Sequence, residues 1–217
     1  MIIPALQLLP GWTQQATPDI TPHPPASFGY LQPSARGGMV FYCTGQKGEY
    51  CGWLSAQHLP LPADLPAVFP VSFDLSVIFN EQALKSGQAF EFDFLHCQKG
   101  WNYLLGTQCL LNQGNALNVS NNSGGWQTPA FPGPQVLAAG VPHRFTLYGV
   151  VDTVAHAYTR GPIIIDNVIY PPPANQSSLK ATNAKWSDGI IAQIQMGTPN
   201  DGSSWNFELL DASVSAG

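Results

Sequence analysis

A strict alternation of apolar and polar residues in two neighbouring segments constrains the fold more than any other feature of this sequence. Residues 71–79 read VSFDLSVIF and residues 88–96 read QAFEFDFLH. Successive side chains of a strand point to opposite faces, so a period of two predicts half-buried β-strands. In the second segment, three phenylalanines share one face and two carboxylates share the other: Phe90, Phe92, Phe94, Glu91 and Asp93.

Shorter segments with the same signature follow one another along the chain, with turn residues between them. Asp166-Asn167 predicts a two-residue hairpin turn, because both residue types tolerate positive φ. Residues 81–86 (EQALKS) are expected to form one helical turn. Short strands at regular spacing indicate a sandwich or a barrel. Further strands are expected within residues 38–43, 101–111, 115–120, 125–128, 141–151, 153–160, 163–165, 168–170, 189–196 and 205–214.

Proline dominates the first 36 residues, which hold seven of the 20 prolines. Proline lacks a backbone donor and fixes φ, which excludes this stretch from helices and central strands. We expect residues 1–36 to be an extended segment packed on the domain or leading into it, pinned by Trp12 and Tyr30. A linker trimmed from a larger protein is the alternative. Residues 37–217 are expected to form one domain.

The charge content of the chain argues against several classes of partner. Only 10% of the residues are charged, against about 25% in an average soluble domain. The net charge is −5 and no basic cluster occurs, whereas nucleic-acid binding needs a basic stripe. No apolar run is long enough for a membrane span. An uncharged polar surface suits neutral glycans, so we expect a secreted or cell-surface protein.

The cysteines are few enough for their pairing to be considered directly. The chain contains Cys43, Cys51, Cys97 and Cys109. Cys43 and Cys51 flank a polar loop, and we expect a disulfide that closes it. Cys97 and Cys109 are a weaker candidate pair, because in a tight hairpin Cys109 lies opposite a residue well before Cys97. Zinc is disfavoured, since there is no C-x₂-C pair.

An ordered series of short motifs runs through the last two thirds of the chain. The motifs are AFEFDF (89–94), LLGTQC (104–109), GGWQTP (124–129), VPHRFTLYG (141–149), AYTRGPIIIDNVIY (157–170) and IIAQIQM (190–196). This series resembles bacterial LamG-like members of the concanavalin A-like lectin and glucanase superfamily, although Pro142 stands before His143 where such domains often have tryptophan. The resemblance implies an all-β jelly roll of two stacked antiparallel sheets, one of them concave, here with a Pro-rich N-terminal extension.

The superfamily includes carbohydrate-binding modules, lectins, glycosidases and polysaccharide lyases, so the fold leaves the function open. Its retaining glycosidases carry a Glu-x-Asp-x-(x)-Glu strand, in which the first Glu attacks and the last donates a proton. Glu91 and Asp93 match the first two positions, but Leu95 or His96 stands at the third. The resemblance therefore implies that the catalytic acid/base is missing from this motif.

The two carboxylates are nevertheless the leading candidates for a binding site. Glu91 and Asp93 are two residues apart on a strand, so they share a face and their backbones are about 7 Å apart. Gln193 and Gln195 have the same spacing. If the two strands are neighbours on the concave sheet, the four side chains form a polar strip for sugar hydroxyls. Aromatic platforms beside it are expected from Trp101, Tyr103 and Trp126, with a core position as the alternative.

The first functional hypothesis is a secreted carbohydrate-binding domain without catalysis, with a glycan as partner. The second is a glycan-cleaving enzyme, either a hydrolase that uses the carboxylates or a lyase that uses His156, which alternates with Tyr158 and Arg160 on one strand. The third is a structural or adhesive surface domain. No cofactor is expected, although a structural calcium at Asp188 or Asp201 stays open.

Overall fold

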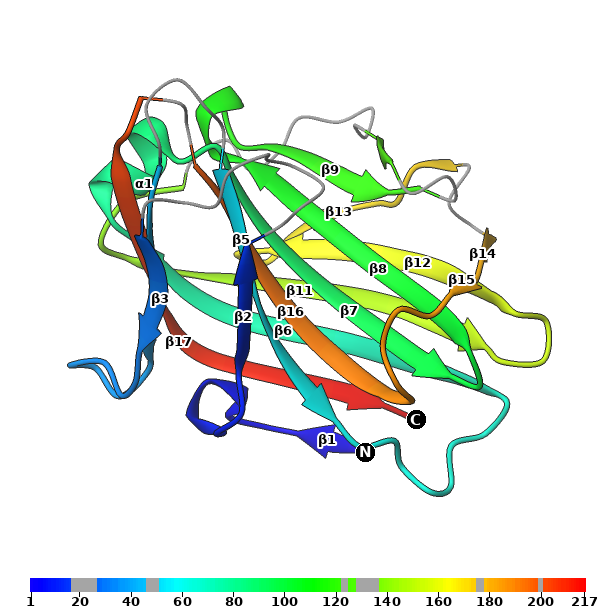
Figure 1. The fold of residues 1–217 in the computed structure, drawn as a ribbon. Helices are drawn as coiled ribbons and strands as arrows, with labels where there is room; N and C mark the ends of the chain where they lie inside the picture. The colour runs from blue at the N-terminus through cyan, green and yellow to red at the C-terminus, as the bar shows by residue number, and fades with distance from the viewer. Residues whose placement is uncertain (17–26, 46–50, 122–124, 128–136, 175–177, 199–200) are drawn as a thin grey trace.

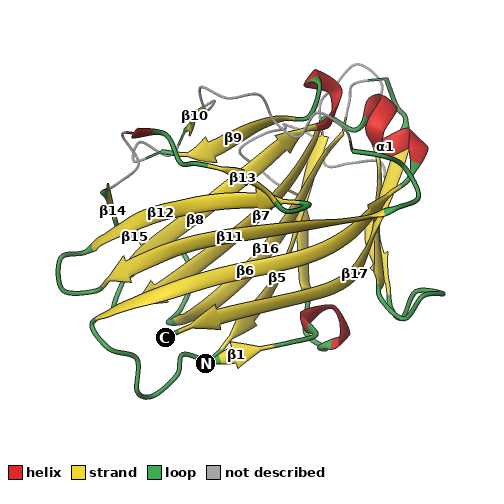
Figure 2. Cartoon of the chain, turned by 180° about the vertical axis from the view of Figure 1, so that it is seen from behind, coloured by secondary structure: helices red, strands yellow, loops and turns green. Residues whose placement is uncertain are grey.

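The chain folds into two antiparallel sheets packed face to face, in a computed structural model that describes residues 1–16, 27–45, 51–121, 125–127, 137–174, 178–198 and 201–217. Sheet B lies in front in Figure 1, and sheet A lies in front in the reverse view of Figure 2. The expected all-β two-sheet sandwich is confirmed.

Sheet A has nine strands. Its main path is β13 (Val168–Tyr170), β12 (Ala157–Ile165), β11 (Pro142–Asp152), β6 (Val68–Phe79), β17 (Ser204–Ala216), β4 (Met39–Thr44) and β3 (Ser27–Leu31). Off this path, β1 (Ile2–Ile3) pairs with β17, and β14 (Leu179–Lys180) pairs with β12.

Sheet B has eight strands. Its main path is β10 (Trp126–Gln127), β9 (Ala116–Ser120), β8 (Trp101–Leu110), β7 (Ala89–Gln98), β16 (Gly189–Thr198), β5 (Cys51–Leu59) and β2 (Thr13–Ala16). The short strand β15 (Thr182–Asn183) pairs with β8.

Aromatic side chains from both sheets meet in the core, as the period of two predicts. Phe90, Phe92 and Phe94 of β7 are fully buried. The ring of Phe90 lies 5.0 Å from that of Phe207 and 5.6 Å from that of Phe145, which belong to sheet A. Edge-to-face pairs of this kind contribute about 0.5–1.5 kcal/mol each beyond their buried area. The phenylalanine face of β7 therefore holds the two sheets together.

Two local predictions are confirmed at turns. Helix α1 (Glu81–Ser86) forms where one helical turn was expected, and the Asn80 side chain caps it by accepting from the Ala83 N–H at 2.8 Å. Asp166 and Asn167 adopt φ of 49° and 68° in the turn between β12 and β13. The described part of the chain also contains the 3₁₀ turns η1 (Leu6–Leu8) and η2 (Leu111–Gln113).

The Pro-rich start of the chain adds edge strands to both sheets, since β1 and β3 belong to sheet A and β2 belongs to sheet B. Trp12 is buried, donates from Nε1 to the Leu6 carbonyl at 3.1 Å and packs its edge against Phe41. Tyr30 also packs against the core. The described part of this segment is thus built into the sandwich, and the two chain ends lie side by side (Figure 1).

The disulfide prediction is wrong. Cys43, Cys97 and Cys109 are buried, and none of the three is in a disulfide. Cys43 lies on β4 of sheet A, whereas Cys51 begins β5 of sheet B, so the two cysteines are not partners across a hairpin. Cys109 is opposite Phe90 on the core face, while Cys97 belongs to a cluster on the other face, which prevents their pairing.

No helix in the described part of the chain is long and apolar enough to cross a membrane.

Candidate functional site

The four polar side chains expected to form a strip do lie together, on adjacent strands. Asp93 of β7 is opposite Gln193 of β16, and Glu91 is opposite Gln195. Gln193 Nε2 donates to Asp93 Oδ2 at 2.8 Å, and Gln195 Nε2 donates to Glu91 Oε2 at 3.2 Å. They lie on the outer face of sheet B, because the alternating phenylalanines of β7 occupy the inner face.

The row of polar side chains continues across β8 and β9. This continuation was not predicted from the sequence. Gln108 lies opposite Glu91, and Asn118 lies opposite Gln108, so one row of polar side chains crosses four strands. The signal was present in ALNVS, where Asn118 and Ser120 alternate with apolar residues. We call the following set the outer-face array: Glu91, Asp93, Gln108, Asn118, Ser120, Gln193 and Gln195.

A glycine makes room for part of this array. Gly106 lies opposite Asp93, and a Cβ atom there would approach Asp93 Oδ1 and Ser120 Oγ to 3.1 Å. The Gly106 N–H donates to Ser120 Oγ at 3.1 Å, and the Thr107 N–H donates to Asp93 Oδ1 at 3.1 Å. The side-chain oxygens of Ser120 and Asp93 therefore accept hydrogen bonds from backbone N–H groups of β8. These bonds form at the point where the pairing of β8 with β9 ends.

The two carboxyl groups lie in a buried setting that favours their protonated forms. Glu91 is 6% exposed and Asp93 is 3% exposed. Burial raises the pKa of Asp93 to about 7, partly offset by hydrogen bonds from Glu91 and Thr107 and by the charge of Arg160. Burial, followed by the charge of Asp93, raises the pKa of Glu91 well above its ordinary value. The raised pKa of Glu91 favours its protonated form, whose hydroxyl is a donor that the Asp93 carboxylate can accept from.

A buried cation connects the array to the opposite sheet. Arg160 of β12 is 2% exposed and reaches across from sheet A. It donates to Thr107 Oγ1 at 3.3 Å and to Ser120 Oγ at 2.9 Å. Burial lowers the pKa of Arg160 to about 10, so the guanidinium keeps its charge at neutral pH.

The array is not an open groove, because its seven side chains are at most 9% exposed. Asn118 Oδ1 is buried without a hydrogen-bond partner in the described part of the structure. Trp126 lies on the same face, directly opposite Ser120, and is 39% exposed. Of the three predicted aromatic platforms, Trp126 is thus the one that is exposed to solvent.

An apolar cluster lies beside the array on the outer face. Ala56, Leu95, Cys97 and Ile191 form a second buried cluster there, and Trp186 packs against it with two smaller residues. Leu95, which stands at one of the two positions where a glycosidase would carry its acid, belongs to this cluster.

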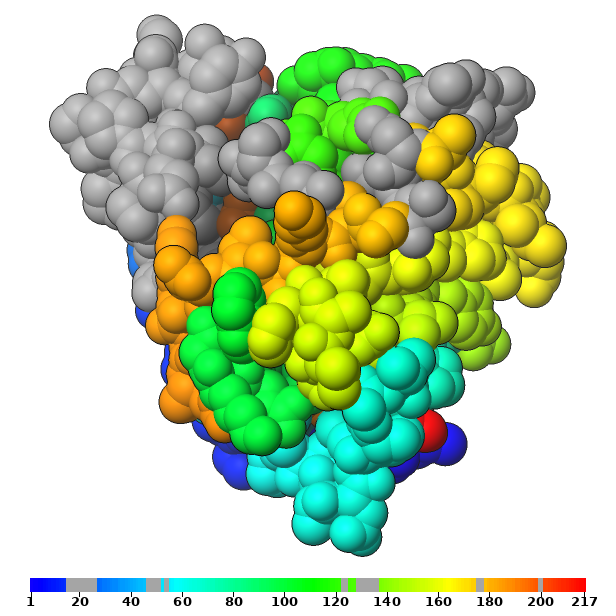
Figure 3. Space-filling view, turned by 90° about the vertical axis from the view of Figure 1, so that its right-hand side faces the viewer, coloured from blue at the N-terminus to red at the C-terminus, as the bar shows by residue number. Residues whose placement is uncertain are grey.

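The other predicted aromatic residues lie on the inner face of sheet B. Tyr103 is buried in the core, and its Oη lies 3.3 Å from His156 Nδ1. Trp101 packs against the core and stacks on the His156 ring, with 4.3 Å between ring centroids. Figure 3 shows this end of the sandwich, where the turn between β11 and β12 lies in yellow-green against the green turn between β7 and β8.

The candidate histidines are not brought to the array. His96 is fully buried on the inner face, with its ring against those of Phe69 and Tyr103. His156 is exposed, whereas Tyr158 and Arg160 are buried in the sandwich, so these three residues do not form one accessible face.

The loop carboxylates considered for calcium are engaged locally. Asp188 Oδ1 accepts from the Lys99 N–H, and Asp201 Oδ1 accepts from the Ser203 N–H, both at 2.8 Å. Within the described ranges, no group of three or more His, Cys, Asp or Glu residues is arranged to hold a metal ion. A structural calcium stays a prediction.

Comparison with known proteins places the chain by its fold. No protein-family model and no curated sequence matches it. The lectin UEA-II complexed with galactose superposes with a TM-score of 0.51 at 6% identity, over 100% of this chain and 98% of the lectin. A variant of the Emp46p carbohydrate recognition domain gives 0.50 at 11% identity, over 97% and 94%.

A carbohydrate esterase from the Shiga toxin-encoding bacteriophage phi24B is also similar, with a TM-score of 0.52 at 10% identity, over 98% of this chain and 96% of the esterase. At such low identity these likenesses show a shared fold and leave the ligand open.

Proposed function

We propose that this chain, which has the concanavalin A-like fold, binds a neutral glycan on the outer face of sheet B and does not cleave it. The outer-face array beside the exposed Trp126 carries this proposal. Amide and carboxyl groups both donate and accept hydrogen bonds, as sugar hydroxyls do. Burying so many polar groups on one face is costly unless they serve recognition or form a complete network. Among the residues that the structure describes, Asn118 Oδ1 has no hydrogen-bond partner, which leaves the network of these residues incomplete.

Trp126 supplies the contact that a sugar reaches first. An indole presents a broad apolar face, on which the C–H face of a pyranose packs. The array lies next to it across the sheet. Its side chains are at most 9% exposed, so the hydrogen bonds it supplies to the ring require these side chains to turn outward on binding. The low charge content and the net charge of −5 favour a neutral glycan over an acidic one. Two of the similar structures are described as a lectin with galactose and as a carbohydrate recognition domain.

Secretion or display at the cell surface is part of the proposal. The uncharged polar composition supports it, and the buried thiols would be shielded from oxidants there. Finding the protein only in the cytoplasmic fraction of its source cells would contradict this location.

Trp126→Ala is expected to weaken glycan binding at least about tenfold. Aromatic contacts contribute about 0.5–1.5 kcal/mol beyond their buried area, and about 1.4 kcal/mol changes Kd tenfold. A glycan array identifies the ligand, and calorimetry with the best hit measures the change.

Tyr148→Ala is the matched control, since Tyr148 is 41% exposed but belongs to β11 of sheet A. Equal losses in the two variants, or no binding to any glycan on the array, would overturn the proposal.

Glycan cleavage is the second candidate function, and the raised pKa values of the buried Glu91 and Asp93 are the feature that favours it. A carboxyl group kept protonated near neutral pH is what a general acid requires. Reducing-sugar and unsaturated-product assays on the glycan that binds would detect turnover. If turnover occurs and Glu91→Gln abolishes it while binding persists, the chain is an enzyme and the non-catalytic proposal fails.

A further inference from the structure

The outer face of sheet A, on the opposite side of the sandwich from the array, contains an open hollow of about 330 Å³. Strands β4, β17 and β6 form its floor, where Glu208 lies between Val40 and Ile78. The rim includes the loop before β4, the start of α1 and residues 139–140. Its main side chains are Arg36, Val40, Ile78, Asn80, Asn206 and Glu208.

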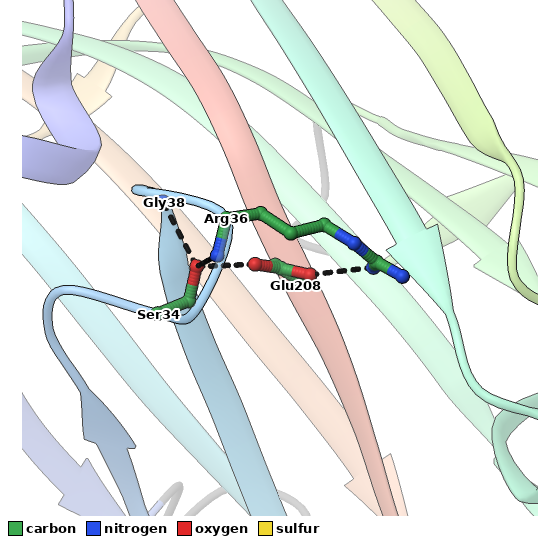
Figure 4. A network of polar contacts seen from close by, with 4 residues as sticks. All are labelled: Ser34, Arg36, Gly38 and Glu208. Carbon is green, nitrogen blue, oxygen red and sulfur yellow. Dashed lines mark hydrogen bonds and ion pairs between the residues drawn. The ribbon is translucent and has the colours of Figure 1, made fainter.

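One side of the hollow is held in place by a polar network (Figure 4). Ser34 Oγ accepts from the N–H groups of Arg36 and Gly38 at 3.2 and 2.9 Å, and donates to Glu208 Oε1. Arg36 Nη1 donates to Glu208 Oε2 at 2.8 Å. The Glu208 side chain is 12% exposed, while that of Arg36 is 57% exposed. The network fixes both carboxylate oxygens and leaves the far edge of the guanidinium open to a ligand.

On the other side of the hollow, the side-chain amides of Asn80 and Asn206 have N–H groups that can donate to a ligand. Asn80 uses its Oδ1 to accept from the Ala83 and Asn206 N–H groups. Its Nδ2 makes no hydrogen bond with the described residues, and neither does the side chain of Asn206. Both side chains are only partly buried, so these groups face solvent in the hollow.

We propose that this hollow is a second carbohydrate site, which takes one or two neutral sugar rings. Amide and guanidinium donors and a carboxylate acceptor surround the aliphatic side chains of Val40 and Ile78. That arrangement matches a pyranose, whose hydroxyls exchange hydrogen bonds and whose C–H face is apolar. The charges of Arg36, Glu208 and Glu81 sum to −1, which disfavours an anionic ligand.

The size of the hollow limits the ligand to a short one, because small-molecule sites span about 300–1,000 Å³ and this volume is at the lower end. Sites on opposite faces of one sandwich would let a single chain bridge two glycan strands, and both sites engaged on one polymer would raise the avidity. This site does not depend on the array, so either proposal can fail alone.

The test is an amide-detected NMR titration of the full chain with the methyl glycosides of glucose, galactose and mannose. We expect shifts at the Arg36 and Gly38 amides and at the side-chain amides of Asn80 and Asn206. Arg36→Ala and Asn206→Ala should each weaken these shifts about tenfold in apparent affinity. Unchanged spectra elsewhere in each variant show that the fold is intact.

Arg144→Ala is the matched control, because Arg144 is also an exposed arginine on the outer face of sheet A, paired with Asp74 at 3.2 Å. It should leave the titration unchanged, as should Trp126→Ala, which affects only the array side. The proposal is overturned if no glycoside shifts the hollow's signals at tens of millimolar, or if methyl glucuronide binds there more tightly than methyl glucoside.

Discussion

Replacing Arg160 with methionine is expected to lower the free energy of unfolding by about 3–5 kcal/mol at pH 8 and the melting temperature by about 10 °C. The substitution keeps the aliphatic volume but removes the donor to Thr107 Oγ1 and Ser120 Oγ. It also removes the cation whose charge lowers the pKa of Asp93, which leaves an uncompensated carboxylate in the sandwich. Urea denaturation followed by tryptophan fluorescence measures the loss.

The charge part of this effect can be separated from the packing part. The pKa of Asp93 is about 7, so at pH 5 this carboxyl group is protonated and the cost of Arg160→Met should shrink. The double variant with Asp93→Asn removes both charges, and it should recover about 1–3 kcal/mol relative to the sum of the single variants. Strict additivity together with a loss that does not change with pH would show that Arg160 acts through packing alone.

The strands with a clean period of two were predictable from local sequence. Phe90, Phe92 and Phe94 determine which face of β7 is the core, because no other register buries all three. The positions of Glu91 and Asp93 on the outer face follow from this. Their contact with the glutamines of β16 depends on strand order within sheet B, a long-range property for which the sequence alone offers no register.

Exposure was not predictable in the same way. Alternation shows that the two faces of a strand differ in chemistry, but both faces of β7 are buried in this fold. The polar strip is therefore a buried network rather than an open groove. The predicted platforms Trp101 and Tyr103 also lie elsewhere than expected. They are odd-numbered residues of β8, like Leu105 and Cys109, and therefore face the core.

The place of Arg160 depends on an irregularity that the sequence does not reveal. Tyr158 and Arg160 face the core from even positions, whereas Ile163 and Ile165 face it from odd ones. The register between β11 and β12 shifts between Leu147 and Gly149, which places an extra residue in β12 and changes the parity. The alternation of His156, Tyr158 and Arg160 predicted that the three side chains share one accessible face. In the structure Tyr158 and Arg160 are buried between the sheets, and only His156 of the three is exposed.

Glu91→Gln is expected to make the protein more stable at pH 8, with little change at pH 4. Both carboxyl groups have a raised pKa in the folded state, so the folded chain keeps protons that the unfolded chain releases near pH 4. Their contribution to stability is complete below that pH and is lost as the pH rises, through about 7 for Asp93. Glutamine carries no proton to lose.

The amide also keeps the geometry of the pair. Its oxygen can accept from Gln195 Nε2 in place of Glu91 Oε2, and its nitrogen can donate to Asp93 as the protonated acid does. Denaturant titrations of both proteins between pH 4 and pH 8 give the difference directly. Glu81→Gln is the control, because the Glu81 side chain is 82% exposed and should change stability little at any pH. If the free energy of unfolding of Glu91→Gln matches that of the unsubstituted chain at every pH, the folded state does not raise the pKa of Glu91. The electrostatic account of the outer-face array is then wrong.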